Sequence, residues 1–416
     1  MRVYLVGGAV RDQLLGHPYQ EKDYVVVGAS PEELIAQGFQ SVGKDFPVFL
    51  HPTSKEEYAL ARTERKQGNG YHGFTFSTSS DITLEQDLSR RDLTINAIAR
   101  DEETGELFDP YHGKYDLEHK ILRHVSDAFI EDPLRVLRVA RFAARYASYG
   151  FTVADETLAL MQKLVASGEL NHLVAERVWK ETSRALMEKH AEVYFEVLRA
   201  CGALKVLFPE IDALFGIPQR PEFHPEIDCG VHTLMSLKQA CQQNYSLDVR
   251  FAVLVHDLGK ALTPAHILPR HIMHEERGVV PVAELCDRLK VPSQTKKLAL
   301  IVCKEHLKCH QALILKPGTL WRLLQKLDVL RRPEQVIEFI QACESDAKGR
   351  LGLEDRPYPQ AQYIQEAVVC VRNIKAQDLP EYVKGPDIGE MLIKKRIEAL
   401  GELKARFKDK QLELNH

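Results

Sequence analysis

Short apolar runs separated by polar turns mark the first part of the chain. The runs are rich in β-branched and aromatic residues, and several are bounded by glycine, which is typical of short strands. They cover residues 2–6, 24–27, 46–50 and 57–61. Residues 31–37 carry a helical pattern between two of these runs, with Ser30 as the expected N-cap. The pattern predicts a small α/β domain at the N-terminus.

From Asp127 onward the apolar residues recur with the period of a helix. The clearest helical segments are residues 134–146, 157–164 and 193–204. Proline and glycine interrupt the pattern at residues 216–225, 264–269 and 316–318. We therefore expect the rest of the chain to be almost entirely helical. One polar stretch in the N-terminal part, residues 65–73, contains three glycines and predicts a mobile loop.

The length and composition fit a modular globular protein. With 416 residues the chain is long enough for two or three domains of roughly 150 residues each. Its 44% hydrophobic and 27% charged residues exclude a disordered chain, a collagen-like repeat and a disulfide-stapled miniprotein. The net charge is −4, which by itself argues against a nucleic-acid partner.

That net charge is unevenly distributed. Residues 1–230 hold 26 Lys and Arg against 36 Asp and Glu, a net charge of −10. Residues 231–416 hold 29 against 23, a net charge of +6. A polyanion would therefore bind preferentially to the second half of the chain.

The cysteines and the apolar segments bear on where the protein works. All eight cysteines lie between Cys201 and Cys370, and none forms a CxxC pair, so we expect reduced buried thiols rather than a zinc knuckle or a disulfide framework. The N-terminus lacks an apolar stretch of signal-peptide length, and no apolar run is long enough to span a membrane. These features predict a cytoplasmic protein without a membrane partner.

A glycine pair and three carboxylates suggest phosphate and metal binding near the N-terminus. Gly8, between a strand and a helix, would let backbone N–H groups approach a phosphate that Arg11 could also bind, although a lone pair of glycines more often forms only a tight turn. Glu21 and Asp23 stand at i and i+2 on an extended segment, where they could hold divalent cations on one side or be solvated. A third carboxylate, Glu57 on a neighbouring strand, favours the metal site.

Arginines are concentrated in two later segments. Arg90 and Arg91 open a predicted helix over residues 90–97, where they point in different directions, so at most one of them is expected to reach a triphosphate. In the helix over 134–146, at about 100° per residue, four arginines fall within an arc of roughly 120° with no acidic partner on that face. They are Arg135, Arg138, Arg141 and Arg145. This stripe indicates an anionic ligand, and Asp132 with Arg135 offers an acceptor and a donor that could read a base edge.

Taken together and in order, these motifs resemble the bacterial CCA-adding enzymes of the class II tRNA nucleotidyltransferases, over essentially the whole chain. The motifs are GGAVRD, the acidic pair before YVVVG, RRDLTINA and EDPLRVLRVARF. The resemblance implies an α+β fold: a nucleotidyltransferase α/β head followed by an all-helical neck, body and tail. It further implies Mg²⁺ held by Glu21 and Asp23, with Glu57 also catalytic, and two-metal nucleotidyl transfer from CTP and ATP to the 3′ end of tRNA with release of pyrophosphate.

The resemblance also implies roles for individual residues. The residues expected to contact CTP or ATP are Gly8, Arg11, Arg91, Arg138 and Arg141. Asp132 and Arg135 would select first C and then A. This sequence departs from the family at the metal pair, which is usually Asp-x-Asp, because its first member here is Glu21. Glutamate supplies the same oxygen ligand with a longer reach.

A second group of candidate ligands lies in the helical half. Eight of the 17 histidines fall between residues 224 and 310, and one of them forms an adjacent pair, His256 and Asp257, at the end of a buried apolar segment. A single histidine is more often structural, but imidazole and carboxylate ligands from several helices can build a metal site that activates water.

This group resembles the HD phosphohydrolase superfamily, whose pattern is a His, an adjacent His-Asp pair and a distal Asp. His232, His256, Asp257 and Asp346 match it, whereas His306-Leu307 stands where some relatives have a second His-Asp pair. The resemblance implies 2′,3′-cyclic phosphodiesterase, 2′-nucleotidase and phosphatase activities with Ni²⁺ or another divalent transition metal.

The expected domains are a head over 1–125, a neck over 126–222, an HD domain over 223–350 and a helical tail over 351–416. The sequence leaves the choice between a monomer and a homodimer open. Three other functions remain in competition: a poly(A) polymerase with the same head and neck, a signalling-nucleotide hydrolase built on the HD site, and a non-catalytic RNA-binding protein.

Overall fold

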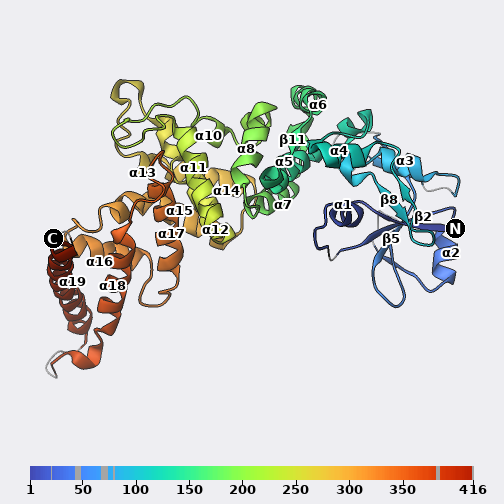
Figure 1. Cartoon of the computed structure of the whole chain (residues 1–416). Helices are drawn as coiled ribbons and strands as arrows, with labels where there is room; N and C mark the ends of the chain where they lie inside the picture. Colours follow the sequence, from blue (N-terminus) through green and yellow to red (C-terminus); the bar gives the residue numbers. More distant parts are fainter. Residues whose placement is uncertain (20, 43–47, 67–73, 78–79, 381–384, 415–416) are drawn as a thin grey trace. The chain divides into compact units, whose positions relative to one another are not determined.

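The computed structural model describes residues 1–19, 21–42, 48–66, 74–77, 80–380 and 385–414 (Figure 1). Internal contacts divide the chain into two compact units, Met1–Leu207 and Phe208–His416. The boundary between the units falls inside the predicted neck. The finer division into four domains stays a prediction.

The first unit contains a seven-stranded mixed sheet with the strand order β3-β4-β5-β2-β1-β8-β9. Its strands are β1 (Arg2–Val6), β2 (Asp23–Val27), β3 (Gln40–Val42), β4 (Val48–Leu50), β5 (Glu57–Leu60), β8 (Ala99–Asp101) and β9 (Leu107–Phe108). Strand β1 is antiparallel to β2 and β8, and β2 is parallel to β5. A separate antiparallel pair joins β6 (Thr63–Lys66) to β7 (Phe74–Ser77).

Alternate side chains of the strands pack on opposite faces of this sheet, as the period of a strand requires. On one face Tyr4 and Val25 belong to a core with Leu88. On the other face Val26 packs with Leu34 of a flanking helix. Because a shift of one residue would exchange these faces, the two cores fix the register of β2 between β1 and β5.

Helices cover the sheet and then continue the first unit. They are α1 (Gly8–Leu14), α2 (Pro31–Ala36), α3 (Leu84–Ser89), α4 (Gly113–His119), α5 (Leu134–Tyr146), α6 (Asp155–Ala166), α7 (Ala175–Leu186), α8 (Ala191–Ala200) and α9 (Ala203–Leu207). A short parallel pair, β10 (Ile121–Leu122) with β11 (Thr152–Val153), lies among them. Helix α5 packs against α7 and α8. The capping box that starts α2 at Ser30 confirms the predicted N-cap.

Two helix predictions in this unit are wrong. The expected helix over 193–204 is broken after α8, because Gly202 has φ +82°, a left-handed conformation that glycine adopts without strain. Residues 90–97 do not open a helix but follow α3. There the Asp92 carboxylate accepts from the backbone N–H of Leu93 and from Asn96, and only a 3₁₀ turn, Thr94–Asn96, forms.

The regular elements of the second unit are all helices among its described residues. Its longer helices are α11 (Cys229–Gln242), α12 (Leu247–Val255), α14 (Val279–Arg288), α15 (Ser293–His310), α16 (Pro317–Lys326), α17 (Gln335–Lys348), α18 (Pro359–Asn373) and α19 (Asp387–Leu414). Two short helices, α10 (Pro209–Asp212) and α13 (His274–Arg277), lie among them. Helices α11, α12, α15 and α17 pack against one another (Figure 1).

The arrangement confirms the predicted α+β class, with an N-terminal sheet domain and a helical remainder. Seven of the eight cysteines are buried and Cys370 is half-buried, and all are free thiols. Of the predicted mobile loop, residues 65 and 66 belong to β6, and the rest lies outside the described residues. Within the described part of the chain, no helix is both long and apolar enough to cross a membrane.

Candidate functional site

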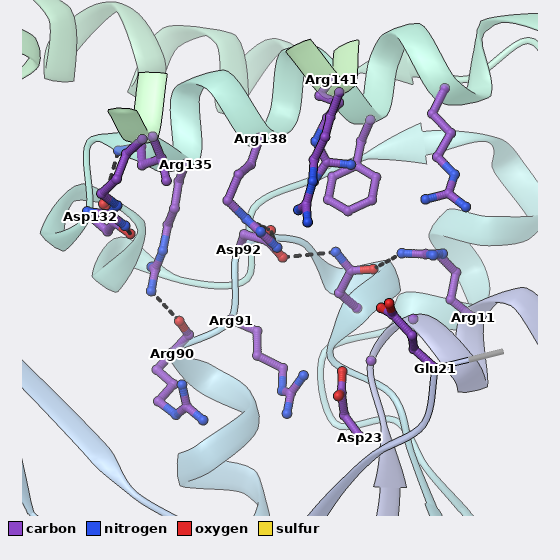
Figure 2. A pocket seen from close by; sticks show the side chains of 18 of the residues that line it. Arg11, Glu21, Asp23, Arg90, Arg91, Asp92, Asp132, Arg135, Arg138 and Arg141 are labelled. Carbon is purple, nitrogen blue, oxygen red and sulfur yellow. Dashed lines mark hydrogen bonds and ion pairs between the residues drawn. The ribbon is translucent and has the colours of Figure 1, made fainter. Parts of the chain in front are cut away.

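A cavity of about 540 Å³ in the first unit collects most of the residues predicted for nucleotidyl transfer. Its walls come from the turn after β1, α1, the start of β2 with the segment before it, the residues after β5 and after α3, and helices α5 and α7 (Figure 2). The predicted residues that line it are Gly8, Arg11, Glu21, Asp23, Arg91, Asp132, Arg135, Arg138 and Arg141. Their roles remain predictions, but the fold brings them together from segments more than 100 residues apart.

The acidic pair lies opposite the arginines of α5. Glu21 and Asp23 both line the cavity, as expected for carboxylates at i and i+2 (Figure 2). Loss of water around Asp23 raises its pKa, and the nearby Glu21 adds to this effect while Arg91 opposes it. Glu57 is exposed and is not among the residues that line the cavity, but its Cα is the register partner of Asp23 on the adjacent strand. Glu21 and Asp23 thus suit a hard divalent cation, which would relieve the repulsion between the two carboxylates.

The turn from β1 into α1 requires glycine at its first position. Gly7 has φ +69°, and a Cβ added there would lie 3.0 Å from Nη1 of Arg91. A side chain at this position would therefore be strained and would press on an arginine of the cavity. Nε of Arg91 is buried without a hydrogen-bond partner in the described part of the chain. Because Gly7 has no side chain, the Arg91 guanidinium can lie against the backbone at the cavity wall.

The predicted arginine stripe of α5 faces the cavity, but three of its members are already paired. Arg138 donates to Asp92, with 2.7 Å between Nε and Oδ2, and Arg141 donates to Glu181 over 2.7 Å. Arg135 donates to the backbone carbonyl oxygens of Ala128 and Arg90. These partners hold the guanidinium groups in fixed positions, which reduces the entropy that a ligand must remove on binding.

A continuous hydrogen-bond chain joins the two sides of the cavity. Arg11 donates to Oδ1 of Asn96 over 2.6 Å, and Nδ2 of Asn96 donates to Asp92 over 2.9 Å. Asp92 in turn accepts from Arg138 (Figure 2). Burial raises the pKa of Asp92, but the Arg138 charge and the Asn96 hydrogen bond outweigh it and hold that pKa well below its usual range. Asp92 is therefore a fixed negative charge that contacts Arg138 directly and is linked to Arg11 through Asn96.

Several lining residues were missed by the sequence analysis. Arg177 and Arg184 come from α7, and Arg177 lies 3.3 Å from Oδ2 of Asp132. Arg90 lines the cavity together with Arg91, although at most one of the two was expected there. The other additions are Gly7, Arg62, Asp92, Asn96, Leu134 and Phe142. No motif marks Arg177 or Arg184 in the sequence, because only the packing of α7 on α5 brings them to the site.

A second candidate site is buried among α11, α12, α15 and α17 of the second unit. Nε2 of His232 lies 2.9 Å from Oδ1 of Asp346, and Nε2 of His256 lies 3.2 Å from Oδ2 of Asp257 and 3.6 Å from Oδ1 of Asp346. All four side chains are at most 5% exposed. The four predicted ligands are therefore brought together, and three of them, His232, His256 and Asp346, fit a common ion.

The imidazoles of this cluster are oriented by the backbone. Nδ1 of His256 lies 2.7 Å from the carbonyl oxygen of Val253, which can only accept, so Nδ1 carries the proton. Nδ1 of His232 likewise faces the Gly349 carbonyl and Oε1 of Glu226. In its neutral form each ring would therefore present the lone pair of Nε2 toward the carboxylates. Nε2 of His256 and Oδ1 of Asp257 are buried and lack a hydrogen-bond partner in the described part of the chain.

The buried carboxylates of the cluster stabilise a positive charge beside them. Burial lowers the pKa of His256, yet the Asp257 and Asp346 carboxylates outweigh it and raise that pKa to about 10. Burial raises the pKa of Asp257, but His256 and Lys260 hold it well below its usual range. Burial and the His256 charge lower the pKa of His306. A metal ion among these groups would supply the positive charge and satisfy the orphaned atoms, so the donor set fits a divalent transition metal.

Two family models match the first half of the chain, and the second match ends eight residues inside the second unit. Residues 3–123 match the family described as "Poly A polymerase head domain". Residues 150–215 match the family described as "Probable RNA and SrmB- binding site of polymerase A". The two matches cover the sheet domain and the helices that follow α5.

Whole-chain relatives carry a more specific description. A protein of Acinetobacter baumannii described as "Multifunctional CCA protein" is 75% identical over 416 residues, which is the full length of both chains. One of Acinetobacter baylyi with the same description is 74% identical over 409 residues, 98% of this chain and 99% of the relative. A third, from Pseudomonas fluorescens, is 60% identical over 401 residues, 96% and 98% of the two chains.

Solved structures share the fold at low sequence identity. A CCA-adding enzyme in apo form II has a TM-score of 0.64 at 20% identity, with 97% of this chain and 92% of the other covered. The Thermotoga maritima CCA-adding enzyme, solved in complex with tRNA, has a TM-score of 0.61 at 21% identity, with 98% and 91% covered. A CCA-adding enzyme solved with CTP has a TM-score of 0.62 at 20% identity, with 100% and 91% covered.

Proposed function

Because the chain belongs to the family of bacterial multifunctional CCA proteins, we propose that it adds C, C and A to the 3′ end of tRNA from CTP and ATP. The observation that carries the proposal is the charge of the cavity. Its lining includes ten arginines and four carboxylates, Glu21, Asp23, Asp92 and Asp132. Such a site suits a nucleoside triphosphate with its cations and the phosphate-rich end of an RNA.

In the proposed mechanism, Glu21 and Asp23 hold Mg²⁺, and Glu57, on the strand next to Asp23, contributes a third carboxylate to catalysis. The bound ions would activate the terminal tRNA hydroxyl and neutralise the departing pyrophosphate. The residues of the chain then position the reactants. Gly8 and Arg11 hold the phosphates against α1, and Arg91, Arg138 and Arg141 neutralise their charge.

Base selection is proposed for Asp132 and Arg135. In the structure Oδ1 of Asp132 accepts from the backbone N–H of Leu134, and Oδ2 lies near Arg177. Arg135 is oriented by the two carbonyl oxygens that accept from it. An acceptor and a donor fixed in this way can form paired hydrogen bonds with the edge of a cytosine or an adenine, and mispairing leaves buried groups unsatisfied.

The metal-dependent step can be tested with Asp23→Ala. We expect this variant to bind tRNA but to lose nucleotide incorporation, because Glu21 and the exposed Glu57 cannot hold the cations without Asp23 beside them. The adjacent Lys22 is a cation and cannot replace the lost ligand. Glu103→Ala, which removes an exposed carboxylate of the same unit, serves as a control and should retain incorporation. Normal incorporation by a folded Asp23→Ala protein would contradict the metal-dependent mechanism.

A second activity is favoured by the buried histidine cluster. We propose that His232, His256, Asp257 and Asp346 hold Ni²⁺ or another divalent transition metal and hydrolyse phosphoesters such as 2′,3′-cyclic nucleotides, 2′-nucleotides and phosphomonoesters. The orphaned His256 Nε2 and Asp257 Oδ1 support this proposal. Hydrolysis of 2′,3′-cyclic AMP with added Ni²⁺ is expected for the parent protein and for Asp23→Ala, but not for Asp346→Asn. Equal rates in Asp346→Asn and the parent would contradict it.

The competing functions account for fewer of these features. A poly(A) polymerase would share the head and neck, but the full-length relatives at 60–75% identity are described as CCA proteins. A signalling-nucleotide hydrolase leaves the arginine-rich cavity unexplained. A non-catalytic RNA-binding protein explains neither that cavity nor the buried cluster.

A further inference from the structure

The guanidinium of Arg11 is held from two sides at the cavity of the first unit. The Asp12 carboxylate accepts from Nε over 2.8 Å and from Nη2 over 3.0 Å, and Oδ1 of Asn96 accepts from Nη1 over 2.6 Å. An arginine has five N–H donors, so within the described part of the chain these contacts leave one N–H on each of Nη1 and Nη2. Because Arg11 lines the cavity and its side chain is only 5% exposed, its orientation decides whether those two donors reach a ligand.

Two aromatic rings of α5 lie over the same guanidinium. Cζ of Arg11 is 5.3 Å from the ring centroid of Phe142 and 5.4 Å from that of Tyr146. The two centroids are 6.2 Å apart, and the ring planes differ by only 5°. Both distances to Cζ lie within the range of a cation–π contact, which is stronger where water is excluded, and both residues are buried. The rings therefore restrict the movement of the guanidinium.

Phe142 also lies close to two other arginines of α5. Its ring centroid is 4.7 Å from Cζ of Arg141 and 5.8 Å from Cζ of Arg138, and its side chain lines the cavity. Cations gathered around one ring repel each other until an anion binds. The faces of an aromatic ring carry partial negative charge, so Phe142 offsets part of this repulsion. The ring thus helps to keep three arginines assembled for a ligand.

A hydrogen bond from Tyr146 fixes the carboxylate that holds Arg11. The Tyr146 hydroxyl lies 3.1 Å from Oδ1 of Asp12. Burial raises the pKa of Tyr146 to about 12, although Arg11 opposes the rise, so the hydroxyl keeps its proton and donates to the carboxylate. Asp12 is itself buried. Tyr146 therefore contacts Arg11 through its ring and Asp12 through its hydroxyl.

We propose that Phe142 and Tyr146 are positioning residues, which aim the two remaining donors of Arg11 at the phosphates of the incoming CTP or ATP. The proposal rests on the proposed nucleotidyl transfer and names further residues for that site, because the sequence motifs assign no role to either ring. Each ring acts through Arg11 rather than on the nucleotide. A guanidinium that is ordered in advance reduces the entropy lost on binding. Since CTP and ATP share the triphosphate, binding of both should depend on the rings to the same extent.

Binding of CTP and ATP without tRNA tests the proposal, measured by calorimetry with Mg²⁺ on the full-length chain. Tyr146→Phe keeps the ring and removes only the hydrogen bond to Asp12. We expect its Kd for both nucleotides to rise about fivefold, as when binding must order one long side chain. Phe142→Leu keeps an apolar side chain but removes the ring, and its Kd should rise at least as much. Tyr149→Phe removes the phenol of a tyrosine that is 48% exposed and lies beside Tyr146, and it should match the parent.

Arg11→Lys distinguishes the positioning of Arg11 from a general role of the rings in packing. Lysine keeps a cation beside Asp12 but lacks the planar group that the rings orient. In this background Tyr146→Phe should change the Kd by less than about twofold. The same rise in both backgrounds, or no rise in the native one, would overturn the role of Tyr146. An unchanged Kd in Phe142→Leu would overturn the role of Phe142.

The outcomes separate this inference from the function on which it rests. A parent protein that binds both nucleotides with this dependence but adds neither to tRNA would contradict the proposed function and leave the positioning of Arg11 in place. A rise in Kd for only one of the two nucleotides would contradict the contact with phosphates. A parent protein that binds neither CTP nor ATP would overturn both.

Discussion

Removal of Glu181 should destabilise the first unit because it leaves Arg141 buried without its partner. Nε of Arg141 lies 2.7 Å from Oε2 of Glu181, and the two side chains are 8% and 5% exposed. Breaking a buried pair from one side costs about 3–5 kcal/mol. Arg141 borders the cavity and can turn partly toward water, so we expect the lower end of this range, about 3 kcal/mol, for Glu181→Ala.

The expected shift can be measured with a fluorophore on the same helix. The chain has two tryptophans, Trp179 on α7 and Trp321 in the second unit, so in a Trp321→Phe background the fluorescence reports on the first unit. For a unit of this size each 1 kcal/mol moves the melting temperature by about 2–4 °C, which predicts a fall of roughly 6–12 °C. Glu176→Ala, which removes an exposed carboxylate of α7, should change it little.

A double variant separates lost pairing from lost packing. Replacement of both partners by apolar residues, Arg141→Met with Glu181→Leu, should recover most of the stability because no charge stays buried. It should still raise the KM for CTP, since Arg141 faces the cavity. A Glu181→Ala protein that melts within about 1 °C of its parent would refute the reasoning, because a buried unpaired charge would then carry no cost.

Three further predictions follow from single contacts. Gly7→Ala should lower kcat/KM for CTP at least tenfold, because the added Cβ would press on Arg91. Gly16→Ala is the control, since Gly16 has the same φ of +69° but no atom within 4 Å of an added Cβ, and kcat/KM should not fall. Equal losses in the two variants would contradict this reasoning. Arg177→Ala should raise the KM for CTP and ATP roughly fivefold with little change in kcat, as loss of about 1 kcal/mol of binding implies, and Lys180→Ala on the same helix should leave KM unchanged. Burial lowers the pKa of His224 to about 4, so its folded form binds fewer protons than the unfolded chain. Unfolding of metal-free protein, followed by Trp321 fluorescence in a Trp179→Phe background, should show stability lost as pH falls from about 6.5 toward 4, and less so in His224→Gln.

Features encoded by local periodicity could be predicted from the sequence. The α5 helix and its arginine stripe follow from spacing within one segment, and the strand carrying Asp23 follows from its β-branched residues. The segment after α3 could not be predicted in the same way. Its apolar residues, such as Leu93 and Ile95, are fully buried, and Asp92 bonds its own backbone, so tertiary contacts override the helical pattern.

The ligand geometry of the two sites also depends on distant contacts. Arg177 reaches the cavity only because α7 packs against α5, and the sequence around it carries no marker of that packing. His274 reaches Asp257 because the backbone of its segment approaches Gly259 closely. The glycine is visible in the sequence, but the segment that approaches it is not. By contrast, His256 and Asp257 could be identified because adjacent ligands at a helix end form a local pattern.

The central claim is that the arginine-rich cavity adds C, C and A in order to tRNA. The direct measurement is incubation of tRNA lacking its 3′-terminal CCA with labelled CTP and ATP, singly and together, followed by sequencing of the products. The account predicts two C residues with CTP alone and termination after CCA with both nucleotides. Open-ended addition of A, or no incorporation by the folded protein, would contradict it.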